Sequence, residues 1–362
     1  LGIYKLFFLA RVPASAACNT AVEMTKRCSH AGTVKFVNAV LRTAAREPEK
    51  ATFPTGKAHE AENLALSLQH PEWLVRRWIG QFGYEEARAL CEFDNAQATL
   101  SLRTNTLKIT RDKLLERLSK EGVEAEPSAW TPEGILCLRH GSLDALESLQ
   151  QGLFQVQDES SMLVAHILAP EPGEFVLDVC SAPGGKTTHI AASMGDCGRI
   201  VALDVHEHKM RRIAENCERL DIKSVEPLLL DAREVGRRFP RQADRVLVDA
   251  PCSGLGVLRR KPDARWRKRP DDLAALARLQ REILSSAAEA VKSGGVLVYS
   301  TCTIEREENE AVVEDFLARH EEFSLENAGE LLPLKKRPEQ MLQLYPQRDG
   351  TDGFFIARMR RR

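Results

Sequence analysis

The sequence lacks both an excess of one charge and a long apolar run. Lys and Arg number 51 against 52 Asp and Glu, so the formal net charge of -1 provides no global field for nucleic acid or an acidic membrane. Residues 6–10 are apolar, but five residues are too few for a secretory signal, and Arg11 and Pro13 interrupt the run. No uncharged stretch approaches the roughly 18 residues that a membrane-spanning helix needs. We therefore expect a cytoplasmic protein without a membrane partner, whose nucleic-acid contacts are local.

Regular cysteine spacing is also missing. The nine cysteines are an odd number without a dense pattern, which argues against a secreted disulfide scaffold and for a reducing compartment. No Cys-x-x-Cys is present, so we expect no metal site. With 22 glycines, 17 prolines and 43% hydrophobic residues, the composition excludes collagen-like structure and wholesale disorder. The chain is an ordinary globular protein with thiols available for chemistry.

The length of 362 residues and the changes in apolar periodicity predict three parts. In residues 1–60, apolar side chains such as Val34, Val37 and Leu41 recur at helical spacing, and a linker without periodicity follows at residues 47–61. The pattern begins abruptly at Leu1, so we expect that the first helices of this unit are missing. Residues 61–151 predict a small α/β module, with helices at 71–82, 84–95 and 110–121 and strands at 99–103 and 134–138.

Residues 152–362 alternate short apolar strands with helices. The clearest helix is expected at residues 271–292, where Leu273, Leu276 and Ile283 share one face. Strands that are apolar throughout and separated by helices indicate a parallel sheet covered on both faces. The expected strands are residues 175–179, 200–204, 225–230, 245–249, 296–301 and 353–359.

A glycine-containing loop between the first of these strands and the next helix carries the strongest local signal. From Asp178 to Thr187 it reads Asp-Val-Cys-Ser-Ala-Pro-Gly-Gly-Lys-Thr. Its glycines let the backbone approach a ligand closely, and the following helix offers free N–H groups. If the loop belonged to a P-loop NTPase, its first glycine would fall at Cys180, so that motif fails at one required position, although residues 245–249 resemble an apolar strand ending in a magnesium-binding Asp.

A nucleoside ligand explains more of the pattern. Asp204 stands 19 residues after Gly185 at the end of the second strand, where a Rossmann-like fold places the acid that binds ribose hydroxyls. Asp231 ends the third strand and is placed to contact an adenine, and Asp178 and Asp249 end the first and fourth. The alternative is that these acids only cap the helices that come next.

Two cysteines follow strands that are expected to end at this same edge. Cys252 stands in Asp249-Ala250-Pro251-Cys252, and Cys302 stands in Thr301-Cys302-Thr303. A single cysteine is most often a small buried apolar residue, which suits the other cysteines. Here both thiols are expected to reach one pocket.

The loop from Cys180 to Lys186, the Asp-Ala-Pro-Cys element and the Thr-Cys-Thr element, in that order, resemble the RNA cytosine-5 methyltransferases that use S-adenosylmethionine. Arg11-Val12-Pro13, Asn19-Thr20-Ala21-Val22 and residues 36–42 (Phe-Val-Asn-Ala-Val-Leu-Arg) are similar to the NusB-like RNA-binding domain of the bacterial small-subunit rRNA methyltransferase B family, also called Sun or Fmu. The resemblance extends over nearly the whole chain. It implies an α/β fold with a Rossmann-like S-adenosylmethionine-dependent methyltransferase domain, an N-terminal all-α NusB-like domain and the small α/β module between them.

The resemblance also implies a division of labour between the thiols. Cys302 is the expected nucleophile at carbon 6 of cytosine, which makes carbon 5 able to attack a methyl group, and Cys252 assists release of the product. Lys186 and Asp249 are expected to stabilise charge on the base. The DNA enzymes, which use the Pro-Cys cysteine with a Glu-Asn-Val element, match less well because Glu310 follows Glu308-Asn309. The implied S-adenosylmethionine site comprises Cys180, Ser181, Ala182, Pro183, Gly184, Gly185, Lys186, Asp204, Asp231 and Asp249.

A local basic segment is the candidate RNA contact. Guanidinium groups for phosphates and an aromatic ring for base stacking suit a single RNA strand, whereas the alternative is a solvated loop. The predicted RNA-binding residues are Arg259, Arg260, Lys261, Arg265, Trp266, Arg267, Lys268 and Arg269.

Together these observations predict a monomeric enzyme that methylates carbon 5 of a specific cytidine in small-subunit (16S) ribosomal RNA through a covalent cysteine-cytosine intermediate. Two rival functions remain open. A P-loop NTPase would bind ATP with magnesium and leave Cys302 without a role. A non-catalytic ribosome-assembly factor would bind RNA through the NusB-like unit and tolerate loss of both cysteines.

Overall fold

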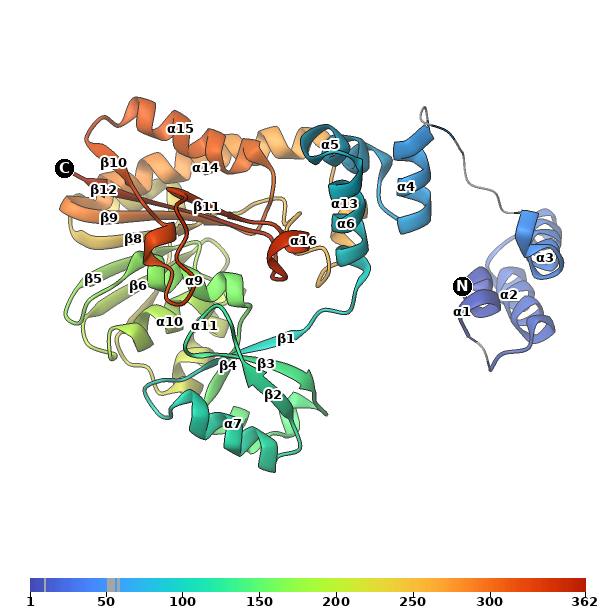
Figure 1. Cartoon of the computed structure of the whole chain (residues 1–362), viewed down its shortest axis with the longest axis horizontal. Coiled ribbons are helices and arrows are strands. Elements are labelled where there is room, and N and C mark those ends of the chain that lie inside the picture. Colours follow the sequence, from blue (N-terminus) through green and yellow to red (C-terminus); the bar gives the residue numbers. More distant parts are fainter. Residues whose placement is uncertain (10, 51–55, 57–58) are drawn as a thin grey trace. The chain divides into compact units, whose positions relative to one another are not determined.

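The computed structural model describes the chain except for residues 10, 51–55 and 57–58, and it divides into two compact units. One unit runs from Leu1 to Val75 and the other from Arg76 to Arg362. Figure 1 shows their helices and strands, labelled where there is room. In the described part of the chain, no helix is both long and apolar enough to cross a membrane.

The first unit is helical, as the apolar periodicity predicted. The helix α2 (Ala14–Cys28) packs against α1 (Gly2–Phe8) and α3 (Ala31–Arg46) and buries Ala17 and Cys18. The expected linker at residues 47–61 lies partly outside the described residues. Its described part holds a short 3-10 turn, η1 (Pro48–Lys50), and the start of α4 (Glu60–Leu68).

The second unit contains a small antiparallel sheet with the strand order β2-β3-β1-β4. Leu102, Ile135 and Phe154 from the sheet pack against Leu114 and Leu118 of the helix that covers it. Two strands that the sequence did not indicate are short, and one of them is exposed, so they lack a readable apolar pattern. The helix α5 (Glu72–Phe82) crosses the boundary between the two units. The elements that follow are α6 (Tyr84–Asn95), β1 (Leu100–Thr104), α7 (Arg111–Lys120), β2 (Glu124–Pro127), β3 (Gly134–Arg139), η3 (Leu143–Ala145), α8 (Glu147–Gln150) and β4 (Phe154–Val156).

The large sheet of this unit has the order β10-β12-β9-β8-β5-β6-β7, with β11 paired to β12. All six strands expected from the sequence form, and their ends differ by a few residues. The strands are β5 (Phe175–Val179), β6 (Arg199–Asp204), β7 (Val225–Leu229), β8 (Ala243–Asp249), β9 (Val291–Thr301), β10 (Phe323–Glu326), β11 (Met341–Leu344) and β12 (Phe354–Arg361).

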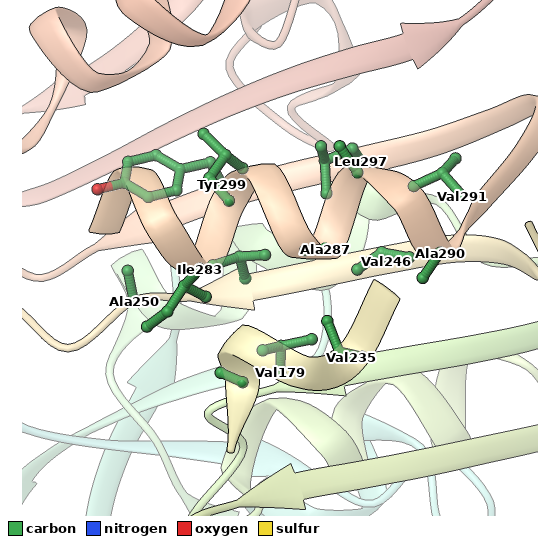
Figure 2. Close-up of a cluster of buried hydrophobic side chains, with 14 of the residues drawn as sticks. Val179, Val235, Val246, Ala250, Ile283, Ala287, Ala290, Val291, Leu297 and Tyr299 are labelled. Atoms are coloured by element: carbon green, nitrogen blue, oxygen red, sulfur yellow. The ribbon is translucent and has the colours of Figure 1, made fainter. Parts of the chain in front are cut away.

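Helices cover both faces of the large sheet because its central strands β5, β6, β8 and β9 are buried on both sides. On β5, Val176 packs with the helices on one face, and Leu177 packs with those on the other. Figure 2 shows the second of these cores, where Ile283 and Ala287 of the long helix α14 (Pro270–Ala290) lie against the sheet. The remaining helices and turns are α9 (Glu159–Leu168), α10 (Gly185–Ser193), α11 (Glu207–Leu220), η4 (Ala232–Glu234), α12 (Val235–Arg238), α13 (Ala264–Arg267), η5 (Arg306–Glu308), α15 (Glu310–Arg319), η6 (Gly329–Leu331) and α16 (Pro346–Asp349).

The prediction of a wholly parallel sheet is wrong at one end. Strands β5 to β9 run parallel, but β12 is antiparallel to β9, and β10 and β11 are antiparallel to β12. The chain turns back through α16 between β11 and β12, so β12 enters the sheet in the opposite direction. An apolar strand pattern reports burial on two faces but carries no information on direction.

Candidate active site

A cleft of about 530 Å³ lies beyond the carboxyl ends of β5, β6 and β8. Parallel strands that neighbour one another end at the same edge, and this edge is where open α/β sheets bind ligands. The order β6-β5-β8-β9 therefore brings together loops that are far apart in the sequence. The predicted site residues among those that line the cleft are Cys180, Ala182, Asp204, Asp231, Asp249, Cys252, Lys261 and Cys302.

The thiols of Cys252 and Cys302 meet in this cleft, with 3.4 Å between their Sγ atoms. The pairing of Asp249 with Ser300 on β8 and β9 sets the two following loops side by side. A hydrogen bond of 2.8 Å between the hydroxyls of Ser253 and Thr303 joins these loops one residue beyond each cysteine. The structure thus brings the two predicted cysteines into one pocket.

The surroundings shift the pKa values of the two thiols in opposite directions. The hydrogen bond from Cys252 lowers the pKa of Cys302, and the Lys186 ammonium acts in the same direction, against burial and the charge of Asp249. The same hydrogen bond, together with burial, holds the pKa of Cys252 well above its usual range. Burial also raises the pKa of Cys180, the third cysteine that lines the cleft. Cys302 is therefore the cysteine of the three that the site favours as a thiolate.

Lys186 and Asp249 form an ion pair, with 2.7 Å between Nζ and Oδ2. The other carboxylate oxygen of Asp249 accepts a hydrogen bond of 2.9 Å from the Ser300 hydroxyl. Burial lowers the pKa of Lys186, but the charge and the hydrogen bond of Asp249 outweigh it, so the pKa is raised. The ammonium also lies 5.1 Å from the centre of the Phe354 ring. Lys186 is thus held as a cation beside the thiols.

The loop between β5 and α10 adopts a backbone that suits close approach of a ligand. Cys180 and Gly184 have φ angles of 64° and 95°, and a Cβ atom on Gly184 would come within 3.3 Å of the Ile213 backbone. The backbone N–H and the hydroxyl of Ser181 both donate to the carbonyl of Leu203 on β6. These two hydrogen bonds therefore hold the loop to the neighbouring strand β6, near the edge where the ligand is expected.

The four strand-end acids have different surroundings. Asp178 is fully buried and accepts a hydrogen bond from Thr187, and burial raises its pKa to about 7. Asp204 caps the next turn through a 2.9 Å bond from the N–H of His206 and lines the cleft. Asp231 also lines the cleft, but its carboxylate is paired with the guanidinium of Arg233 at 2.7 Å. For Asp204 and Asp231, capping and lining the cleft therefore occur together, whereas the buried Asp178 does not line the cleft.

A buried arginine of the small sheet supports the same loop, and the sequence did not point to it. Arg103 on β1 donates to the carbonyl of Gly185 at 2.5 Å and to the hydroxyl of Thr188 at 2.9 Å. Burial lowers the pKa of Arg103 to about 9. Its contacts fall on the first turn of α10, so the small sheet helps to hold the loop. Nothing in the local sequence around Arg103 distinguishes it from a surface arginine.

The basic segment of residues 259–269 divides into inward and outward side chains. Arg260 pairs with Asp158 at 2.5 Å and with Asp352 at 2.6 Å. Arg265 is buried and donates to Asn95 at 2.8 Å, and Arg259 lies 4.2 Å from the centre of the Phe93 ring. These three guanidinium groups therefore have partners within the protein, and Arg260 also lines the groove described next. Their contact with RNA stays a prediction.

The outward residues of this segment lie beside the cleft. Lys261 lines the cleft and also a neighbouring groove of about 810 Å³, which Arg267 and Lys268 line as well. Trp266 is 61% exposed, and Arg269 is exposed at the start of α14. A positively charged groove therefore continues from the thiols over the surface, although the groove also contains Asp263 and Asp272.

A carboxylate and two imidazoles form the one group of potential metal ligands found in the described residues. One oxygen of Glu133 lies 3.0 Å from Nε2 of His166 and 3.1 Å from Nε2 of His189. These are hydrogen-bond lengths, and the buried Arg103 charge acts on both Glu133 and His189. The cluster is thus accounted for as a hydrogen-bonded bridge from the loop before β3 to α9 and α10.

Models of known families match three successive stretches of the chain. Residues 165–360 match the 16S rRNA methyltransferase RsmB/F family, residues 70–144 match the ferredoxin-like domain of RsmF/B-like methyltransferases, and residues 1–46 match the NusB family. The domain limits predicted from the sequence, at residues 60 and 151, stay a prediction.

Curated relatives are similar over the full length of the chain. The probable ribosomal RNA small subunit methyltransferase B of Bacillus subtilis is 42% identical over 369 aligned residues, which cover 100% of this chain and 81% of the relative. The corresponding protein of Synechocystis is 40% identical over 100% of this chain and 82% of the relative. Ribosomal RNA small subunit methyltransferase B of Pseudomonas syringae is 34% identical over 99% and 79%.

Solved structures have a similar fold. The crystal structure of PH0851 has a TM-score of 0.83 at 33% identity and covers 99% of this chain and 80% of its own. A methyltransferase homolog protein from Pyrococcus horikoshii has a TM-score of 0.72 at 31% identity, covering 85% of this chain and 100% of its own. NSun6 from the same organism, determined with SFG, has a TM-score of 0.72 at 28% identity, with coverage of 80% and 98%.

Proposed function

The chain belongs to the RsmB/F family of 16S rRNA methyltransferases, and from this premise we propose that it methylates carbon 5 of a cytidine in small-subunit ribosomal RNA, using S-adenosylmethionine. The observation that carries the proposal is the pair of thiols 3.4 Å apart in the cleft, of which Cys302 has the lowered pKa. A ribosome-assembly factor that only binds RNA has no use for such a pair.

Two thiols suit this reaction because carbon 5 of cytosine is a poor nucleophile. The Cys302 thiolate forms a bond to carbon 6, and the electron pair of the ring double bond moves to carbon 5, which then takes the methyl group. A base such as a water molecule then takes the proton from carbon 5, the electron pair of that C–H bond restores the double bond, and the Cys302 sulfur leaves as a thiolate. Cys252 keeps its proton, and its S–H hydrogen-bonds the leaving sulfur, which supports its role in release.

The residues around the cleft fit the cofactor. S-adenosylmethionine supplies an electrophilic methyl group on a positively charged sulfonium. The cleft volume of about 530 Å³ suits a nucleoside-sized ligand, and acids such as Asp204 and Asp249 favour a cation there. We infer that Asp204 binds the ribose hydroxyls and that the loop from Cys180 to Gly185 holds the rest of the nucleoside. The related NSun6 structure was determined with SFG, an S-adenosylmethionine analogue.

Lys186 and Asp249 are proposed to act on the base rather than on a phosphate chain. Their ion pair lies next to Cys302, and both charges act on that thiol. An ammonium and a carboxylate at this position can stabilise charge that develops on the ring after attack at carbon 6. In a P-loop NTPase the corresponding lysine is needed for phosphates, and here the loop has Cys180 where that motif needs glycine.

The RNA strand is proposed to follow the groove that Lys261, Arg267 and Lys268 line. The groove shares Lys261 with the cleft, so a strand lying in it delivers a base to the thiols. Exposed Trp266 is placed to stack on a neighbouring base. We expect the protein to act as a monomer without a metal ion.

Transfer of labelled methyl groups to RNA, followed by nucleoside analysis, tests the proposal. We expect 5-methylcytidine with the unmodified protein and no product with Cys302→Ala, because carbon 5 is then not activated. Cys252→Ala is expected to complete attack and methylation but to stall at release, which leaves RNA attached in a denaturing gel. Attachment with Cys302→Ala instead would exchange the two roles, and full activity of both variants would remove the covalent mechanism.

A further inference from the structure

Two consecutive buried residues, Glu308 and Asn309, lie behind the cysteine loops and have no part in the reaction described so far. Glu308 ends η5, and Asn309 is the residue before α15. Both are fully buried, and neither lines the cleft. The Glu-Asn-Glu sequence differs from the Glu-Asn-Val element of the DNA enzymes, so the sequence left these residues without a role.

Asn309 holds the residues on both sides of Cys302. Its side-chain oxygen accepts a hydrogen bond of 2.6 Å from the Thr301 hydroxyl, and its amide donates one of 3.0 Å to the carbonyl of Thr303. The amide also donates to Gln343 on β11 at 2.7 Å. The loop that carries the Cys302 thiol is therefore fastened on each side of the cysteine to one side chain.

Glu308 does the same for Cys252, with the help of Gln280 on α14. One carboxylate oxygen accepts from the backbone N–H of Ser253 at 2.8 Å and from the Gln280 amide at 2.9 Å. The same amide donates to the carbonyl of Pro251 at 2.9 Å. The residues before and after Cys252 are thus both tied to this carboxylate, directly or through one amide.

We propose that Glu308 and Asn309 are positioning residues that set the separation and orientation of the two thiols. Asn309 binds the loop of Cys302, and Glu308 binds the loop of Cys252. Because a peptide bond joins Glu308 to Asn309, the two loops cannot shift independently. The Ser253–Thr303 hydrogen bond closes the arrangement on the cleft side. This inference rests on the proposed roles of Cys302 and Cys252, but its test includes a measurement on the thiols alone.

The burial of these groups supports a role beyond filling space. A fully buried carboxylate without a cation partner among its described contacts is expensive to desolvate, and an apolar side chain would pack there at less cost. A misplacement of about 1 Å can reduce a rate about 100-fold. The polar residues are therefore best explained by the geometry that they impose on the cysteines.

The test compares Asn309→Ala, Glu308→Ala and Glu308→Gln with the control Asn327→Ala. Asn327 also bridges two backbone groups through its amide, the carbonyl of Pro338 and the N–H of Glu330, but in a loop away from the cleft. For Asn309→Ala and Glu308→Ala we expect kcat to fall about 100-fold, with the KM for RNA and the affinity for S-adenosylmethionine within about twofold. Glu308→Gln keeps an acceptor for Ser253 and is expected to recover most of the activity.

The second measurement is the pH profile of Cys302 alkylation by iodoacetamide, followed by mass spectrometry without RNA. Asn309→Ala should shift this profile to higher pH, because the thiolate loses its well-placed Cys252 donor, whereas Asn327→Ala should not.

Unchanged kcat and an unchanged profile in Asn309→Ala would overturn the inference. So would a fall in kcat matched by equal losses in cofactor affinity and folded fraction, which indicates a structural role only. If Asn309→Ala does not fold, Glu308→Gln against Glu308→Ala decides by the same two readouts. Absence of 5-methylcytidine with the unmodified protein would instead refute the proposed function, and the alkylation profile of Cys302 would still report on the positioning.

Discussion

The strand-end loops and the basic segment both lie at the cleft. The positions of the side chains in the strand-end loops could be predicted from the sequence better than those in the basic segment. Cys180, Asp249, Cys252 and Cys302 were expected at one edge, and all four line the same cleft. Of the seven basic residues in segment 259–269, Arg259, Arg260 and Arg265 have partners within the protein, although Arg260 also lines the groove. A residue at the end of a parallel strand has its place set by the sheet, whereas a long side chain in an irregular loop can turn toward any partner within reach.

The largest expected effect is a loss of stability on substitution of Arg260, one of the three arginines with partners inside the protein. Arg260→Ala leaves Asp158 and Asp352 without their shared cation, although Arg259 stays 3.9 Å from Asp352 and burial already raises the pKa of Asp352 to about 7. Removing one partner of a largely buried pair costs about 3–5 kcal/mol of unfolding free energy. Urea unfolding should show this loss for Arg260→Ala and almost none for Arg267→Ala. A stable Arg260→Ala that binds RNA weakly would instead support an RNA contact for this arginine.

The next largest effect is a loss of cofactor affinity on substitution of Asp204. It tests whether an acid at the end of a strand binds the ligand as its position predicts. Asp204→Ala removes charge-assisted hydrogen bonds to the ribose but leaves the loop from Cys180 to Gly185 intact. We expect S-adenosylmethionine binding to weaken by about 1.5–3 kcal/mol in calorimetric titration. Asp263→Ala in the groove is the matched control and should leave the affinity unchanged. Equal affinity of Asp204→Ala and the parent would reduce this acid to a cap of the next turn.

Acid should weaken the unit that holds the strand-end loops. Burial lowers the pKa of His189 to about 4 from the usual 6.5, so the folded protein keeps this imidazole neutral while the unfolded chain takes up a proton below pH 6.5. Stability is therefore complete above pH 6.5 and declines toward pH 4, by about 2 kcal/mol between pH 7 and pH 5. The pKa of Glu133 is also lowered, which adds a further loss below about pH 4.5.

Urea unfolding at a series of pH values checks this expectation. His189→Gln should flatten the decline between pH 6.5 and pH 4, whereas His208→Gln, at an exposed position, should leave it as it is. An equal decline in all three proteins would assign the acid sensitivity to other groups.

The smallest expected effect is a change in the salt dependence of RNA binding on substitution of the outward basic residues. Neutralising Lys261, Arg267 and Lys268 together should reduce the log-log salt slope of RNA binding by about two units, at roughly 0.7 per contact on a single strand. S-adenosylmethionine affinity should barely change. An unchanged slope would mean that the groove is a solvated surface and that RNA reaches the cleft from another side.

The fold and the candidate site were predictable to different extents. The helices at residues 71–82 and 84–95 and the six strands of the catalytic domain followed from periodicity, because burial on one or both faces leaves a repeating apolar pattern. The strands β2, β4, β10 and β11 and the helix α9 were missed, since they are short or lack a clear contrast between faces. The supporting residues Arg103, Glu308 and Asn309 were out of reach because their partners lie far away in the sequence.

The sequence by itself determined the alternation of strands and helices, the helical first unit, and the identity and order of the elements that end at the cleft. These depend on local patterns and on the rule that neighbouring parallel strands end together. Only the tertiary structure decided the antiparallel course of β12, the inward turn of three arginines and the 3.4 Å approach of two thiols. Each of these depends on contacts between segments far apart in the chain, whose free energies no local pattern encodes.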